Sequence, residues 1–216
     1  MNWTVDALCA GTAAPFRGRS KSAFAKQPVT GPVMITAMGL SGDQQAYRKR
    51  HGGPDMALHH YPRDHHAYWA TELGGHPLLE EPGAFASNLS TIGLTEGEVR
   101  LGDRFRLGTA LIEACQPRQP CWKIEHRFDR KGMVKRILAT RRCGWFYRVI
   151  EEGEARAGDI LVREGPRGSY WTMAEVFEAV WGSSEAANRA LLEEMAATQL
   201  MARQLREGIR DWLAKH

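Results

Sequence analysis

Residues 99–114 read VRLGDRFRLGTALIEA, and this stretch decides the fold class. Its Gly-Asp and Gly-Thr pairs favour turns, so we predict three short strands: one ending at Leu101, one over 104–107 and one over 110–114. Phe105 and Leu107 alternate with two arginines, which is the period of a strand with one buried face. A second Gly-Asp pair precedes a similar strand over 160–162. Short strands at such close spacing predict a barrel or a sandwich, not a parallel α/β sheet.

The texture of the sequence changes at residues 164–169, EGPRGS, which we interpret as a linker. A capping box follows, in which the Thr172 hydroxyl and the Glu175 carboxylate can each accept a backbone amide hydrogen. Beyond it, apolar residues recur at helical spacing. They predict three helices: over 173–181 with a stop at Gly182, from near Ser184 to Met195, and around Leu205, Ile209, Trp212 and Leu213.

These elements predict two domains, a mainly β domain over residues 1–165 and a three-helix domain over 169–216. About 45 residues of helix cannot form a large core alone. We therefore expect the helices to dock on the β domain, on a partner subunit or on both, which leaves a homodimer open.

The bulk composition excludes several classes of protein. The chain has 216 residues, 43% of them hydrophobic, with no apolar run long enough for a membrane span and no secretory signal, so we expect a cytoplasmic protein without a membrane partner. The four cysteines form no C-x-x-C pair, which argues against structural zinc and iron–sulfur clusters. A net charge of +4 without dense Lys/Arg runs suits an anionic ligand and argues against a nucleic-acid partner.

The segment QPRQPC, residues 116–121, is the strongest candidate for chemistry. It follows a predicted strand, and its two prolines stiffen the loop that presents Cys121. Arg118 and Lys123 are nearby cations, and residues from 122 onward can begin a helix. A cysteine in such surroundings favours the thiolate, the form that binds a soft metal or attacks an electrophile. From these residues alone, a purely structural thiol remains open.

Two glycine-rich segments, GLSGDQ (39–44) and HGGPD (51–55), flank the basic run RKR. Glycine turns beside cations suit a phosphate or another anion, although two ordinary loops joined by a solvated segment fit as well. Five histidines between 51 and 66 do not have the spacing of a zinc motif, so we expect most to be hydrogen-bonded or exposed. Asn88 can read the edge of a heterocycle or simply stabilise a turn.

Taken together, these segments resemble the MOSC family, and within it the YiiM-like branch. The matching stretches, in the family's order, are GLSGDQ (39–44), HGGPD (51–55), LHHYPR (58–63), NLS (88–90), GLTE (93–96) and QPRQPC (116–121). The resemblance implies a MOSC-type β-barrel followed by a small C-terminal helical bundle.

The resemblance also implies a bound molybdenum cofactor, a mononuclear molybdenum–pterin, whereas pyridoxal phosphate is not expected. Cys121 would be the metal ligand, with His51 and Asn88 beside it as catalytic residues. The residues expected to bind the cofactor are Gly42, Asp43, Gly52, Gly53, Arg63, Arg118 and Lys123. The appended helices are expected to leave the barrel's chemistry alone.

Relatives of this branch resemble reductases of N-hydroxylated compounds, such as hydroxylaminopurine-type base analogues. The implied activity is their two-electron reduction to amines. The electrons would come from a separate flavin-containing reductase, because this chain shows no flavin, nicotinamide or iron–sulfur motif. The alternative is a non-catalytic module that carries the cofactor or a sulfur atom on Cys121.

Two positions depart from the family's pattern. Met56 stands where a basic residue is usual, and Ser87 stands where a carboxylate is usual. We hypothesise that the family's basic residue and carboxylate at these two positions form an ion pair in relatives. Both charges would have been lost together here, because losing only one partner of a buried pair is costly. The departures leave the substrate open.

Overall fold

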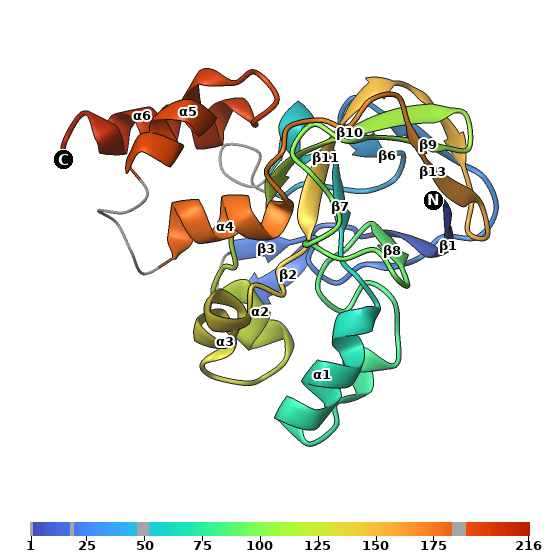
Figure 1. Cartoon of the computed structure of the whole chain (residues 1–216). Coiled ribbons are helices and arrows are strands. Elements are labelled where there is room, and N and C mark those ends of the chain that lie inside the picture. Colours follow the sequence, from blue (N-terminus) through green and yellow to red (C-terminus); the bar gives the residue numbers. More distant parts are fainter. Residues whose placement is uncertain (1, 18–19, 47–51, 183–188) are drawn as a thin grey trace.

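The computed structural model describes residues 2–17, 20–46, 52–182 and 189–216. Seven strands form a closed barrel in the order β13-β9-β10-β11-β7-β8-β1, and β1 pairs back onto β13 (Figure 1). Neighbouring strands are antiparallel, except for the parallel pair β7 and β8. The barrel strands are β1 (Asn2–Ala10), β7 (Leu58–His60), β8 (Leu89–Thr91), β9 (Arg104–Leu107), β10 (Ala110–Pro117), β11 (Trp145–Glu151) and β13 (Ile160–Glu164). The prediction of a barrel is confirmed.

Short strands decorate this barrel. One of them, β4 (Gln27–Pro28), pairs with the end of β1. The others form a three-stranded sheet of β12 (Gly153–Ala155), β5 (Val33–Thr36) and β6 (Gly39–Leu40), and a hairpin of β2 (Ala14–Arg17) and β3 (Ser20–Ser22).

Residues 99–114, which predicted the fold class, fold largely as expected. The strand over 104–107 is β9, its Phe105 and Leu107 side chains are fully buried, and the predicted strand over 160–162 is the start of β13. The strand predicted to begin at Ala110 is β10, which continues three residues further than expected, to Pro117. The prediction of a strand ending at Leu101 is wrong. Arg100 makes only an isolated bridge to Thr172, because the chain there pairs with the start of the helical segment.

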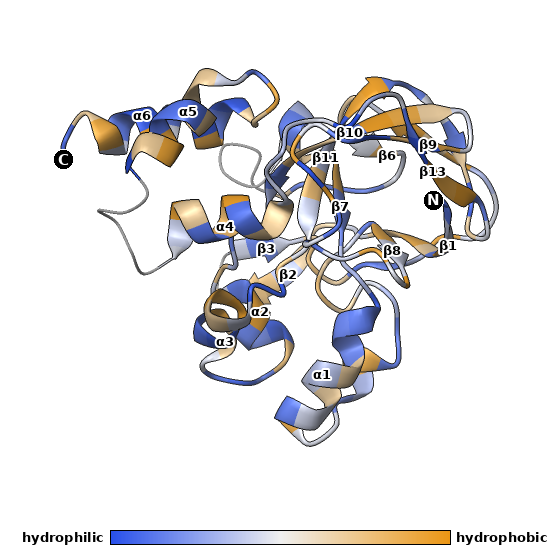
Figure 2. Ribbon diagram, in the orientation of Figure 1, coloured by the Kyte–Doolittle hydropathy of each residue, from blue (hydrophilic) through white to orange (hydrophobic). Residues whose placement is uncertain are grey.

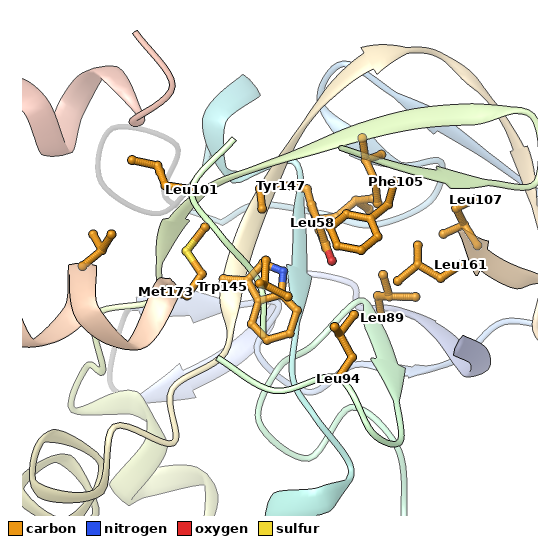
Figure 3. Packing of buried hydrophobic residues seen from close by; sticks show 14 of the residues in the cluster. Leu58, Leu89, Leu94, Leu101, Phe105, Leu107, Trp145, Tyr147, Leu161 and Met173 are labelled. Atoms are coloured by element: carbon orange, nitrogen blue, oxygen red, sulfur yellow. The ribbon is translucent and has the colours of Figure 1, made fainter. Parts of the chain in front are cut away.

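The barrel interior is filled by large side chains from every part of the ring. Trp145, Phe105 and Leu58 are completely buried in one cluster (Figure 3). Met173, at the start of the first C-terminal helix, belongs to the same cluster. The barrel and the C-terminal helices therefore share a continuous apolar core.

Two helical insertions interrupt the barrel strands. The first is α1 (Asp64–Leu73), which follows β7 and is followed by the 3-10 helix η2 (Pro77–Leu79). The second connects β10 to β11 and holds α2 (Lys123–Arg127) and α3 (Met133–Thr140). These insertions bury their apolar sides in a second cluster, which includes Trp69, Phe85, Ile124, Phe128, Met133 and Ile137.

The C-terminal segment forms α4 (Met173–Trp181), α5 (Arg189–Ala197) and α6 (Arg203–Leu213). The predicted capping box is confirmed: Thr172 Oγ1 accepts the Glu175 amide at 3.2 Å, and the Glu175 carboxylate accepts the Thr172 amide at 2.7 Å. Each of these helices carries both hydrophilic and hydrophobic residues (Figure 2). Hydrophobic residues of all three pack in the barrel cluster, whereas Phe177 and Trp181 of α4 pack in the second cluster. The predicted start of the second helix, near Ser184, lies outside the described residues.

The segment 164–169 is fixed to the barrel by a buried carboxylate. Asp103 is fully buried, and it accepts the Gly168 amide at 3.0 Å and pairs with Arg167 at 3.0 Å. This connection sets where α4 begins. Among the described helices, none is long and apolar enough to cross a membrane.

The capping box allows a direct test of the helical segment. Replacing Thr172 by alanine (Thr172→Ala) removes an N-cap hydroxyl, so we expect the free energy of unfolding in urea to fall by about 1 kcal/mol. Thr140→Ala is the matched control, because the Thr140 hydroxyl donates to the Arg136 carbonyl within α3 and caps no helix. An equal loss in both variants would contradict the capping role.

Candidate functional site

A cavity of about 830 Å³ lies between the rim of the barrel where β10 ends and the C-terminal helices. One wall is polar and comes from barrel strands and loops. It includes Lys26, Asp43, Gln44, Gln45, His59, Asn88, Arg118, Cys121 and Lys123. The opposite wall is apolar and comes from α4, α5 and α6. It includes Val180, Trp181, Leu192, Leu205, Ile209 and Trp212.

Cys121 occupies the loop between β10 and α2. The strand ends at Pro117, the chain turns through a second proline at 120, and α2 begins at Lys123, as the sequence predicts. The Cys121 carbonyl accepts the Ile124 amide at 3.0 Å, which fixes the thiol at the start of the helix. Cys121 is half-buried and lines the cavity, whereas the other three cysteines are buried. It is therefore the thiol that a ligand in the cavity can reach.

Arg118 is a half-buried cation without a carboxylate partner in the described part of the chain. Its guanidinium donates to the Phe85 carbonyl and lies 5.1 Å from the centre of the Phe24 ring. Desolvation lowers the pKa of Arg118, because its guanidinium has lost part of its contact with water. A buried charge is retained at low cost only where an opposite charge meets it. The site therefore suits an anion, either a thiolate or a ligand that brings negative charge.

A second cation on the wall is already paired. Lys26 Nζ lies 2.5 Å from both carboxylate oxygens of Asp43, and both side chains are buried. Burial lowers the pKa of Lys26, and Asp43 opposes that shift. Asp43 also accepts the Gly11 amide at 2.7 Å, so the pair is anchored to the end of β1. Neither Lys26 nor this pairing was predicted from the sequence, because nothing local marks a lone lysine as buried.

Asn88 orients the site and does not read a heterocycle through free amide hydrogens. Its Nδ2 donates to the Cys9 carbonyl at 3.0 Å and to Asp43 Oδ2 at 2.9 Å. Its Oδ1 accepts the His59 amide at 3.1 Å. Both donors are therefore used within the protein, and Asn88 holds Asp43 in place against Lys26.

The adjacent histidines point to different places, as the strand period requires. His59 lies on the cavity wall, where Nδ1 is 3.2 Å from the Ala86 carbonyl and 3.3 Å from Arg118 Nη1. Burial, reinforced by Arg118, lowers the pKa of His59 well below its ordinary value. His60 instead lies in the barrel core, bonded to Tyr147 and Thr91. The prediction that these histidines are hydrogen-bonded is confirmed for both.

The structure brings together five of the residues expected to form the site. Those on the cavity wall are Asp43, Asn88, Arg118, Cys121 and Lys123. Gly42, Gly52, Gly53 and Arg63 do not line the cavity. His51 lies outside the described residues.

The residues off the wall have local roles. Gly53 has φ +97°, a conformation that favours glycine. A Cβ on Gly52 would fall 2.2 Å from Gln45 Oε1, so this glycine makes room for a side chain that does line the cavity. Arg63 lies at the start of α1, with a long contact of 3.5 Å to the Glu80 carbonyl.

The expectation that the C-terminal helices leave the barrel's site alone is wrong, because they form its apolar wall. Asp55, in the HGGPD segment, fixes the last of them. Its Oδ2 accepts the Arg203 amide at the start of α6 at 2.7 Å, and its Oδ1 lies 2.9 Å from Arg148 Nε. Arg148 also donates to the Gln199 and Leu200 carbonyls at 3.2 Å. The loop that carries a family motif thus positions the helix that covers the cavity.

The donor set fits a metal that arrives with most of its ligands. Within the described residues, no group of three or more His, Cys, Asp or Glu side chains could hold a metal by itself. The cavity does present one reachable thiol, Cys121, and the half-buried Arg118 guanidinium, which has no described carboxylate partner. Those residues suit an anionic metal–pterin group bound through a single protein sulfur.

The burial of the cysteines predicts selective labelling. Burial raises the pKa of Cys9 to about 11 and that of Cys115 to about 12, and it raises the pKa of Cys143 well above its ordinary value. We therefore expect iodoacetamide at about pH 8 to modify only Cys121 in the folded protein, because the thiolate is the reactive form. Peptide mass spectrometry measures the modification, and the denatured protein provides the control in which all four react. Unchanged native labelling of Cys121→Ser would contradict this assignment.

The buried histidines predict loss of stability in acid. Burial lowers the pKa of His60 to about 3 and that of His66 to about 4, below the value of about 6.5 expected when unfolded. Below about pH 6.5 the unfolded chain binds protons that the folded chain does not. Each of the two histidines therefore lowers the free energy of unfolding by up to about 1.4 kcal/mol per pH unit. We expect the free energy of unfolding to fall between about pH 6.5 and 4.5, and His60→Gln to make that slope shallower. An unchanged slope in urea titrations of His60→Gln would refute the burial of a neutral imidazole.

Comparison with known proteins agrees with this architecture. Residues 47–162 match the model of the MOSC domain. The chain is 46% identical over 153 residues to Protein YiiM of Escherichia coli, an alignment covering 66% of this chain and 68% of that protein. It is 37% identical over 166 residues to a protein named Reductase from Gibberella moniliformis, covering 75% of this chain but only 29% of the fungal protein.

The resemblance extends to the fold. A crystal structure of YiiM from Escherichia coli matches 100% of this chain and 94% of its own, with a TM-score of 0.80 and 32% sequence identity. These matches support a molybdenum-cofactor-binding domain. With its closed barrel, its cavity at the rim and its appended helices, the chain belongs to the MOSC domain family and is similar to YiiM.

Proposed function

We propose that this protein binds a molybdenum–pterin cofactor in the cavity and reduces N-hydroxylated compounds to amines. One observation carries the proposal: in a MOSC domain, the reachable Cys121 thiol and the uncompensated Arg118 guanidinium line the same cavity. A thiolate is a fitting ligand for a soft metal, and a buried guanidinium is a fitting partner for an anion. The relative named Reductase adds support for redox activity.

Three residues of the polar wall would hold the cofactor, each in a different way. Cys121 supplies the sulfur ligand. Arg118 supplies charge-assisted hydrogen bonds to an anionic group, and Lys123 adds positive charge on the same wall. Lys26 is already neutralised by Asp43 and, with Asn88, keeps that part of the wall rigid.

The proposed reaction converts R–NHOH to R–NH₂ and water, and it consumes two electrons and two protons. The bound cofactor would supply the two-electron redox centre, and a separate flavin-containing reductase would supply the electrons. Lys26 and Lys123 are the lysines on the wall that hold protons at Nζ. Burial lowers the pKa of Lys26, so its ammonium group gives up a proton more readily than a fully solvated lysine does.

The aromatic side chains that line the cavity favour a flat, ring-containing substrate. Trp181 and Trp212 come from α4 and α6, and Phe146 comes from β11. Such side chains can pack against a heterocycle while excluding water from the reacting group. A hydroxylaminopurine-type base analogue has this chemistry, with an N–O bond next to a planar ring.

Metal analysis and turnover test the proposal together. In protein loaded with the cofactor, we expect Cys121→Ala to lose its molybdenum and to reduce 6-hydroxylaminopurine about 100-fold more slowly or worse, since weaker perturbations around a metal already cost about 10–100-fold. The measurements are metal content by plasma mass spectrometry and turnover with reduced methyl viologen. Cys115→Ala is the matched control, because Cys115 is buried away from the cavity wall.

The outcomes separate the hypotheses. Full molybdenum in Cys121→Ala would exclude Cys121 as the ligand. Stoichiometric molybdenum in the wild-type protein without turnover of any N-hydroxylated substrate would instead support the non-catalytic carrier.

A further inference from the structure

The positive charge of the chain is concentrated in one segment. Residues 121–142 contain eight lysines and arginines and only two acidic residues, whereas the rest of the chain has 21 basic and 23 acidic residues. This segment is the insertion that carries α2 and α3. We call the α2–α3 face the side chains of Lys123, Arg127, Arg130, Lys131 and Lys135.

The charges of the α2–α3 face are not neutralised within the described part of the protein. Neighbouring arginines are paired, Arg136 with Glu72 at 3.9 Å and Arg141 with Glu178 at 2.8 Å. The members of the face form no ion pair with a described carboxylate. Of the two acidic residues of the segment, Glu125 accepts hydrogen bonds from the Gly132 and Val134 amides, and Asp129 is exposed and forms no ion pair with a described residue. Arg130, Lys131 and Lys135 are exposed, whereas Lys123 and Arg127 are half-buried, so the face presents net positive charge to solvent.

A packed scaffold holds this face in place. Ile124 of α2, Phe128 at its C-terminal end, and Met133 and Ile137 of α3 are all buried. They pack in the cluster that also contains Phe85, beside the site. Because this cluster packs the helices against the rest of the protein, the charges on the α2–α3 face are fixed relative to the cavity.

The face borders the site directly. The segment begins at Cys121, and Lys123 belongs both to the cavity wall and to the face. Trp122, between them, is 48% exposed although it is a large aromatic residue, and its ring lies 5.6 Å from that of Phe16. Exposed tryptophan and arginine side chains are enriched at protein contact sites.

We propose that the α2–α3 face is the docking surface for an acidic face of the electron-donating flavoprotein. This inference rests on the proposed function, because that reaction needs two electrons that the chain has no motif to supply. An acidic partner would be attracted over a distance by the unpaired cations and would dock with its redox group beside the Cys121 loop. The contact would be small and transient, as is usual for electron transfer between proteins.

The same face is poorly suited to nucleic acid. Single-stranded nucleic acids bind along basic grooves lined with successive aromatic platforms. Trp122 is the exposed aromatic residue of the segment, and the cations lie on α2, on α3 and on the connection between them. The position of the charges beside a redox site favours an acidic protein partner.

Charge reversal with two electron donors tests the proposal. We use reduced flavodoxin, a small acidic flavoprotein, and reduced methyl viologen, each driving reduction of 6-hydroxylaminopurine by the cofactor-loaded protein. For Lys131→Glu/Lys135→Glu we expect the flavodoxin-driven kcat/KM to fall about 10-fold or more, since rim charges mainly change association rates. Turnover driven by methyl viologen should not fall. In the wild-type protein, only the flavodoxin-driven rate should drop steeply with added salt.

Arg156→Glu/Lys215→Glu is the matched control, because it changes the net charge equally at exposed positions outside α2 and α3. The proposal is overturned if this control loses as much flavodoxin-driven activity, or if both donors are affected equally. It is also overturned if the Lys131→Glu/Lys135→Glu variant keeps its flavodoxin rate but loses retardation of an oligonucleotide.

Carbodiimide cross-linking separates this inference from the proposed function. Bonds from Lys131 or Lys135 to flavodoxin carboxylates, mapped by mass spectrometry, support the docking surface even if methyl viologen drives no turnover. That lack of turnover would count against the proposed function alone. A wild-type protein that flavodoxin neither reduces nor cross-links contradicts the docking surface.

Discussion

The pairing of β1 with β13 is the constraint on which the rest of the molecule depends. Trp3 faces Leu161 across this pair, so two segments almost 160 residues apart close the ring. Closure removes the free edges of the sheet and fixes the rim at which β10 ends. Because Pro117 stands at that rim, the Cys121 loop, the insertion after it and the covering helices all take their positions from the closed barrel.

The charged residues of the molecule fall into two groups, those with an ion-pair partner and cations without one. Buried Asp103 and Asp43 each have cationic partners, so their burial is compensated and stabilises fixed connections. Among the described residues, neither Arg118 nor the cations of the α2–α3 face have such a partner. Unpaired cations therefore lie both inside the cavity and beside it. This arrangement suits an anionic ligand within and an acidic partner outside.

Local sequence patterns determined the elements and the identity of the reactive loop. Alternation in residues 104–107 predicted a buried strand because side chains on a strand point to opposite faces. The capping box at Thr172 predicted the start of a helix because its hydrogen bonds lie within four residues. Prolines around Cys121 predicted a rigid loop because the ring of each proline fixes its own φ angle. The strand predicted to end at Leu101 failed because its pairing partner, near Thr172, lies about 70 residues away.

What only the tertiary structure decided is which distant residues share the cavity. Lys26 and His59 join the wall through pairings that no short pattern records, and the burial of a lone lysine depends on the placement of Asp43. The helices cover the site because Asp55 holds the start of α6 from a loop 148 residues earlier. The sequence patterns by themselves determined short strands followed by helices and a thiol in a rigid loop, and the family resemblance narrowed the strands to a β-barrel. The closed fold decided what surrounds that thiol, because burial and charge pairing are properties of residues far apart in the chain.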